Sequence, residues 1–182
     1  MTPHPGLAAL LAEIERRPTH SPRNRRVREA VRLPAGDACE YCLLPTVAQF
    51  QIEHIIPPAL WPDYAGGQLA GVPWQPGRRG PNHIANYAWA CEFCNQSKRQ
   101  RVSRRGGRET HRLFDPRRDR WPEHFAFLHQ YLFILGVTDI GRATVETLGF
   151  NDAGLEGPVG TRHEAILTGR YPPSWRRAAF PI

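Results

Sequence analysis

Apolar residues at helical spacing predict two short helices in the N-terminal part of the chain. In the segment GLAALLAEIER, apolar residues from Leu7 to Ile14 recur every three or four positions, with charged residues on the other side. In SPRNRRVREAVRL, Ser21 offers an N-cap, Pro22 offers a first helical residue, and the arginines face outward. The sequence therefore predicts an N-terminal helical segment over residues 1–36.

Alternation of apolar and polar residues predicts a strand that ends in two chemically useful side chains. In VAQFQIEH, Phe50 and Ile52 alternate with polar residues, which is the period of a half-buried strand. Glu53 and His54 lie at the end of this strand. Residues 57–82 then hold so many prolines and glycines that we expect an ordered loop or flexible insert, not a regular element.

A second strand and a helix are predicted after this loop. The segment NYAWAC, residues 86–91, is typical of a short buried strand. The segment NQSKRQRVSRR, residues 95–105, is predicted to be a helix that stops at Gly106 and Gly107. The order along the chain is strand, loop, strand, helix.

The C-terminal part of the chain is predicted to pack on this central region. The segment EHFAFLHQYLFILG, residues 123–136, is apolar enough for a buried element, and GRATVETLGF predicts a short helix with Val145 and Leu148 inward. We therefore expect a central core over residues 37–110 and an extension over residues 111–182.

The composition is typical of one domain with many loops. The chain has 182 residues, of which 41% are hydrophobic, and this is enough for a modest core. Its 18 prolines and 16 glycines exceed average usage, so large regular sheets are not expected.

Positive charge is concentrated in one part of the chain. The formal net charge of +7 favours a polyanionic partner, either nucleic acid or an anionic membrane surface, with Arg-rich coding bias as the alternative. The segment from Lys98 to Arg120 holds ten basic and three acidic residues. No window approaches the roughly 18 apolar residues of a membrane span, and no signal peptide is evident. We therefore expect a cytoplasmic protein without a membrane partner.

The cysteines form the strongest motif in the sequence. All four fall into C-x-x-C pairs, Cys39 with Cys42 and Cys91 with Cys94. Two such pairs can complete the tetrahedral thiolate shell that structural Zn²⁺ prefers. Two disulfides are the alternative, but a chain without a secretory signal is expected in a reducing compartment, where disulfides are rare. The sequence therefore favours a zinc site.

The motifs CEYC, EHIIP, NHIANYAWAC and CNQSK, in this order, resemble the HNH endonuclease family in its zinc-bearing form. The resemblance covers residues 39–98, and LFDPRRDRWPEHF with GVTDIGRATVETLGFND resembles a tail of many small bacterial members. It implies an α+β fold with a small ββα-metal core clamped by the four-cysteine zinc site, N-terminal helices and a mixed C-terminal extension. It also implies metal-dependent hydrolysis of phosphodiester bonds, with double-stranded DNA as the expected partner.

The same resemblance implies a role for each matching residue. His54 matches the general base that activates water, and Glu53 and Asn95 match positions that hold the divalent catalytic ion. Asn86 matches the asparagine that orients the histidine or braces the loop, and nearby Asn82 is a competitor for this role. The usual short connection between the histidine and the asparagine is expanded here by QLAGVPWQPGRRG.

The chemistry needs these residue types for reasons that do not depend on the family. Hydrolysis of a phosphodiester needs a base for water and a hard cation that neutralises developing negative charge. A histidine can accept a proton at neutral pH, and carboxylate and amide oxygens suit Mg²⁺ or Mn²⁺.

Contacts with nucleic acid are expected from the predicted helix that follows the second cysteine pair. Positive side chains there would neutralise phosphates without reading sequence. The expected contact residues are Lys98, Arg99, Arg101, Arg104 and Arg105. Arg78 and Arg79, at the tip of the expanded loop, either touch the nucleic-acid backbone or keep the loop soluble.

Two other functions stay open. A zinc-stabilised nucleic-acid-binding module would use the same basic surface without catalysis, and a toxin would use its N-terminal helices to bind an immunity partner. The loop residue His83 is expected to be solvated. Trp61, Trp74 and Trp89 are expected in the core, with stacking on bases as the alternative.

Overall fold

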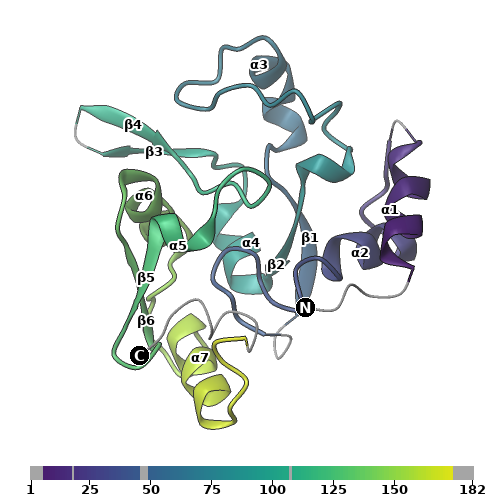
Figure 1. Cartoon of the computed structure of the whole chain (residues 1–182). Helices are drawn as coiled ribbons and strands as arrows, with labels where there is room; N and C mark the ends of the chain where they lie inside the picture. Colours follow the sequence, from purple (N-terminus) through teal and green to yellow (C-terminus); the bar gives the residue numbers. More distant parts are fainter. Residues whose placement is uncertain (1–5, 18, 46–48, 107, 174–182) are drawn as a thin grey trace.

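The computed structural model describes residues 6–17, 19–45, 49–106 and 108–173. Within these residues the strands form three separate two-stranded antiparallel sheets, and short helices surround them (Figure 1). The helices are α1 (Leu7–Glu15), α2 (Arg25–Arg32), η1 (Pro58–Leu60), α3 (Trp61–Ala65), η2 (Ile84–Asn86), α4 (Glu92–Lys98), α5 (Trp121–His124), α6 (Asp139–Leu148) and α7 (Pro158–Leu167). The strands are β1 (Phe50–His54), β2 (Tyr87–Cys91), β3 (Ser103–Gly106), β4 (Glu109–Arg112), β5 (Phe125–Leu128) and β6 (Phe133–Gly136). The prediction of an α+β protein without large sheets is confirmed.

The central element is the β1–β2 hairpin, which lies between α2 and α4 (Figure 1). Alternation along β2 sends Tyr87 and Trp89 to the α2 side, where they join a buried cluster with Val31. The small residues Ala88 and Ala90 face the other way and join the cluster that contains the cysteines. Each face of this hairpin is therefore covered by one helix.

The N-terminal helices form where the apolar spacing predicts them, with one change at a cap. The second helix begins at Arg25, and the Asn24 side chain accepts hydrogen bonds from the backbone N–H groups of Arg26 and Val27. Asn24 therefore provides the cap that we expected from Ser21, because its side-chain oxygen reaches the free N–H groups of the first turn.

The helix predicted over residues 95–105 is wrong at both ends. Helix α4 begins at Glu92 and ends at Lys98, and Arg99 follows with a left-handed φ of 50°. Beyond this turn Val102 is buried, and the chain pairs as β3 with β4. A run of polar and basic residues has no apolar face to hold a longer helix, so the pairing with β4 decides its conformation.

The C-terminal part shares one hydrophobic core with the central hairpin. Residues 125–136 of the apolar segment form a hairpin, β5–β6, and α6 packs on it with Leu148 buried as predicted. Gly141 of α6 makes this possible, since a Cβ there would lie 2.1 Å from the carbonyl oxygen of His124. Strand β4 also crosses position 110, which we expected to separate the core from the extension.

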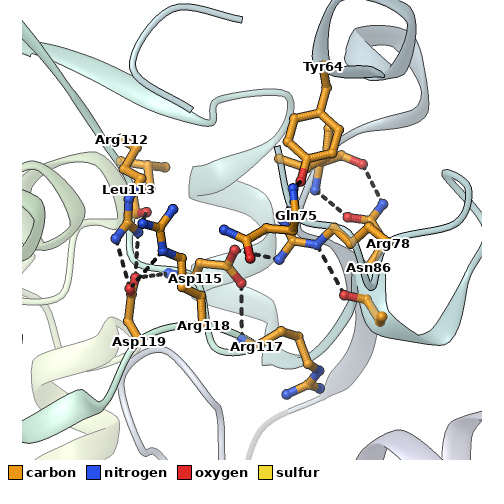
Figure 2. Close-up of polar contacts among 12 residues, drawn as sticks. Tyr64, Gln75, Arg78, Asn86, Arg112, Leu113, Asp115, Arg117, Arg118 and Asp119 are labelled. Atoms are coloured by element: carbon orange, nitrogen blue, oxygen red, sulfur yellow. Dashed lines mark hydrogen bonds and ion pairs between the residues drawn. The ribbon is translucent and has the colours of Figure 1, made fainter. Parts of the chain in front are cut away.

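The proline-rich loop is ordered by a buried polar network and contains the short helices η1 and α3. The Tyr64 hydroxyl is buried and accepts a hydrogen bond from the backbone N–H of Gln75 at 2.8 Å. Figure 2 shows Arg78 in this network, where its guanidinium forms an ion pair with Asp115 at 2.5 Å. The expectation that Arg78 lies at an exposed loop tip is therefore wrong, because it ties the loop to the chain after β4.

No helix within the described ranges combines the length and the apolar character that crossing a membrane requires.

Candidate functional site

The four cysteines come together as one buried cluster. Cys39 and Cys42 lie on a tight turn, Cys91 ends β2, and Cys94 lies in the first turns of α4. Their sulfur atoms all lie within 4.8 Å of one another, and all four residues are buried. The Sγ atoms of Cys42 and Cys91 are 3.6 Å apart, close to the roughly 3.8 Å between sulfurs around a tetrahedral zinc. The thiols are free, so the cluster fits a structural zinc ion and not two disulfides.

The protonation of this cluster couples zinc binding to pH. Burial raises the pKa of Cys94, and hydrogen bonds with the other thiols raise it further. Burial also acts against ionisation of Cys42, but hydrogen bonds from the other three thiols outweigh it and lower the pKa of Cys42. Zinc must therefore displace protons when it binds.

A buried arginine lies near the cysteine cluster, and no pattern in the sequence indicated it. Arg162 is 0% exposed and donates hydrogen bonds to the carbonyl oxygens of Leu132 and Phe150. Its guanidinium lies 5.7 Å from the ring centre of Tyr171, whose hydroxyl donates to the carbonyl oxygen of Cys42. None of the ion pairs among the described residues involves Arg162, although an isolated buried charge is unfavourable. A zinc ion with four thiolates carries two formal negative charges, of which Arg162 would offset one.

Glu53 and Lys98 form a second buried centre between β1 and α4. The Lys98 Nζ atom donates to Glu53 Oε1 at 2.6 Å and to the carbonyl oxygen of His54 at 3.1 Å. The Tyr41 hydroxyl donates to the other carboxylate oxygen of Glu53 at 2.7 Å. Burial raises the pKa of Glu53, and the interactions with Lys98 and Tyr41 act in the opposite direction. With its side chain 1% exposed, Lys98 does not reach a surface phosphate, which corrects its expected role.

His54 lies at the partly exposed end of β1, and its side chain is on the face of the hairpin opposite to that of Glu53. Its ring meets the Tyr87 ring edge-on, with 5.0 Å between the ring centres. Its Nε2 atom is 3.0 Å from the side-chain oxygen of Asn82. With this amide orientation Nε2 carries the proton, and Nδ1 is the ring nitrogen that can accept one. The described residues give Nδ1 no hydrogen-bond partner, so it is available to a water molecule.

Asn86 braces the loop and does not contact the histidine ring. Its side chain is buried, accepts a hydrogen bond from the backbone N–H of Ile56, and donates to the carbonyl oxygens of Ile56 and Pro81. Asn82 holds the ring of His54 instead. Of the two roles that we considered for Asn86, the structure assigns bracing to Asn86 and contact with the histidine to Asn82.

The residues expected to hold a divalent ion do not form one open site. Asn95 donates from its side-chain nitrogen to Gln51 at 2.6 Å, whereas His54 points to the other face of the hairpin. Both oxygens of Glu53 are already hydrogen-bonded, and the ammonium group of Lys98 would repel a cation there. In this arrangement the donor set of Glu53 and Asn95 does not fit Mg²⁺ or Mn²⁺.

The expected nucleic-acid contacts lie on two different elements. Arg99 and Arg101 are exposed just after α4, while Arg104 and Arg105 lie on strand β3. The side chain of Arg104 forms an exposed ion pair with Glu146 at 2.8 Å. These arginines therefore extend along a hairpin rather than along one helix.

Part of the positive charge after Lys98 is neutralised within the fold. Arg112 binds Asp119 through two hydrogen bonds, at 2.5 and 2.8 Å (Figure 2). Arg117 binds both carboxylate oxygens of Glu40. The net charge of the segment thus overstates the charge that it can offer to a partner.

Comparison of the chain with models of known families, with curated proteins and with solved structures finds no match. The cysteine cluster and the surroundings of His54 are therefore the features of this chain that point to a function.

Proposed function

We propose that this protein is a zinc-stabilised nuclease that hydrolyses phosphodiester bonds in nucleic acid, with His54 as the general base. The observation that carries the proposal is the environment of the His54 ring. Asn82 and Tyr87 hold the ring at the end of β1, and its Nδ1 atom has no partner among the described residues. A base in this position can take a proton from water while the water attacks a phosphate.

The zinc ion has a structural role in this proposal. The two cysteine pairs join the turn at Cys39 to the junction between β2 and α4, directly behind the hairpin that carries His54. A closed shell of four thiolates leaves no position for water or substrate. The bound zinc would therefore fix the hairpin, and the histidine would act on the other face.

The HNH resemblance implies a catalytic divalent ion, but both carboxylate oxygens of Glu53 already have partners. For Glu53 to bind such an ion, its carboxylate would have to exchange its present partners, Lys98 and Tyr41. No step of the mechanism is therefore assigned to an ion held by Glu53 and Asn95.

The second candidate function is a nucleic-acid-binding module without catalysis. The observation that favours it is the buried pair of Glu53 and Lys98, which neutralises the predicted acidic ligand. Exposed arginines after α4 would then bind the phosphate backbone. The two candidates differ in one outcome, because only the nuclease cuts its ligand.

The experiment that tests the proposal is cleavage of supercoiled plasmid and of single-stranded RNA, with Mg²⁺, with Mn²⁺ or with EDTA. Loss of a general base lowers a rate by about 10² to 10⁴, so His54→Ala should show no detectable cleavage. His163→Ala is the matched control, because this histidine is exposed on α7. Zinc content and melting temperature should be the same in all three proteins. A His54→Ala protein as active as wild type would contradict the role of His54, and binding without any cleavage would favour the module.

A further inference from the structure

An open groove lies beside α2, apart from the residues that the sequence indicated as nucleic-acid contacts. Its volume is about 560 Å³, and α2 lies on the far side of the central hairpin from β3 and β4 (Figure 1). The residues that line it are Arg23, Arg25, Arg28, Glu29, Arg32 and Trp89.

The groove is strongly positive. Four guanidinium groups face one carboxylate, that of Glu29. Arg32 forms an ion pair with Asp37, whereas Arg23 and Arg25 have no ion pair among the described residues. The first turn of α2 contains no acidic residue, although the helix dipole favours negative charge there. This arrangement raises the repulsion between like charges, and a bound anion would relieve it.

Trp89 lines the groove, and one face of its ring is covered by an arginine that is already fixed. Trp89 is 4% exposed, and its indole N–H has no hydrogen-bond partner among the described residues. The guanidinium of Arg28 lies 5.1 Å from the ring centre of Trp89, and it donates to the carbonyl oxygen of Phe50 at 3.1 Å. Arg28 is therefore held in place before any ligand binds. A fixed cation beside further guanidinium groups points to a ligand with negatively charged oxygens.

The groove and His54 lie on the same face of the hairpin. Tyr87 and Trp89 are two residues apart in β2 and point to the same side, and the His54 ring contacts Tyr87 on that side. Arg28 of the groove contacts Phe50, the first residue of β1, and His54 is the last residue of this strand. The usual rise of a strand separates these two residues by about 13 Å. At roughly 3.4 Å per nucleotide of a duplex strand, this distance is about four nucleotides.

We infer that the α2 groove binds the phosphate backbone of the nucleic acid, a few nucleotides from the phosphate that reaches His54. The inference rests on the proposed function, and it adds a second anchoring surface to the arginines after α4. Its ligand chemistry is a row of phosphodiesters, bound without regard to sequence. The arginines of the groove would position the strand, and the histidine would act a few nucleotides away.

The test compares two variants with the same net charge. The groove variant is Arg23→Gln/Arg25→Gln/Arg32→Gln, and the control is Arg120→Gln/Arg142→Gln/Arg170→Gln, whose residues are exposed on the α5, α6 and α7 side. Binding of a fluorescent duplex of about 20 base pairs is measured by anisotropy between about 50 and 200 mM salt. The groove variant should bind about tenfold more weakly at low salt, and its salt slope should fall by about 2 to 3. The control should stay within about twofold of wild type.

Several outcomes would overturn the inference. Equal weakening in both variants would show an effect of net charge alone, and wild-type binding to phosphatidylserine vesicles but not to the duplex would indicate a membrane surface. Single variants at Arg23 and Arg25 repeat the test if the triple variant has lost zinc or melts early. A cleavage assay separates this inference from the proposed function. If wild type cuts nucleic acid and the groove variant binds the duplex as tightly as wild type, only the groove inference is refuted. If the groove variant binds more weakly but wild type cuts nothing, only the nuclease proposal is refuted.

Discussion

The Nζ atom of Lys98 lies 2.6 Å from Oε1 of Glu53, and both side chains are buried. We expected these residues to meet a phosphate and a metal ion, and the fold instead pairs them with each other. The pair joins the end of β1 to the last residue of α4. It therefore contributes to holding the hairpin against the helix.

Removing one member of this pair should destabilise the protein strongly. Lys98→Met leaves the Glu53 carboxylate buried without its cation, which typically lowers stability by about 3 to 5 kcal/mol. The measurement is urea unfolding followed by circular dichroism. The double variant Lys98→Met/Glu53→Gln should recover part of the loss, because it removes the uncompensated charge. A single variant as stable as wild type would contradict the buried pairing.

Zinc removal should unfold the central region. Structural zinc in small modules contributes about 10 to 16 kcal/mol to the folded state, and the four cysteines form one buried cluster. We expect one zinc per chain by elemental analysis, and loss of near-ultraviolet circular dichroism after chelation. Cys94→Ser should lower zinc content and solubility. Natively purified, folded protein without zinc or another thiolate-bound metal would contradict this prediction.

Arg162 should tune the affinity of the cysteine cluster for zinc. Residues that contact metal ligands from outside typically change metal affinity by about 10 to 100-fold. Arg162 is a buried cation that contacts the ring of Tyr171, and the Tyr171 hydroxyl in turn donates to the carbonyl oxygen of Cys42. We therefore expect Arg162→Gln to weaken zinc binding in competition with a chromophoric chelator. Arg162→Lys keeps the charge and should recover part of the affinity. If the glutamine variant folds and holds zinc as tightly as wild type, the arginine has only a packing role.

Replacing Asn82 should lower activity, whereas replacing Asn86 should lower stability. Asn82→Ala releases the His54 ring but breaks no buried contact, so cleavage should fall by about 10 to 100-fold with an unchanged melting temperature. Asn86→Ala leaves the N–H of Ile56 buried without a partner and should lower stability by about 1 to 3 kcal/mol. Plasmid cleavage and thermal melting measure the two effects. The same loss of stability in both variants would contradict this division of roles.

His83 should make the protein less stable in mild acid. We expected a solvated side chain, but His83 is buried, and its Nδ1 atom accepts a hydrogen bond from the backbone N–H of Ala85. Burial, followed by the charges of His20 and Arg79, lowers the pKa of His83, and Glu15 acts weakly against them. The folded pKa therefore lies below the unfolded value near 6.5.

The direction of this pH effect follows from proton binding. Between the two pKa values the unfolded chain binds more protons, so stability falls as the pH drops below about 6.5. Melting temperatures at about pH 7.5 and pH 5.5 should differ more for wild type than for His83→Asn, whose amide oxygen can still accept from the same N–H. An equal difference in both proteins would assign the pH dependence to other groups.

Features that depend on local spacing could be predicted from the sequence. The two C-x-x-C pairs indicated one buried cluster, because thiolates two residues apart can point at one ion. Alternation in β1 predicted that Glu53 and His54 end a strand, and apolar spacing located α1 and α2. The abundance of proline and glycine correctly indicated short elements.

The partners of the charged residues depend on tertiary packing. Arg78 pairs with Asp115, Glu53 with Lys98, and Arg162 lies near the cysteine cluster, although each partner is distant in sequence. The end of α4 at Lys98 was also set from outside the helix, by the pairing of β3 with β4. A charged residue on a short segment can face solvent or a partner equally well. Which one it meets depends on how the hairpins and helices pack, because a buried charge is stable only where packing brings an opposite charge or several hydrogen bonds to it.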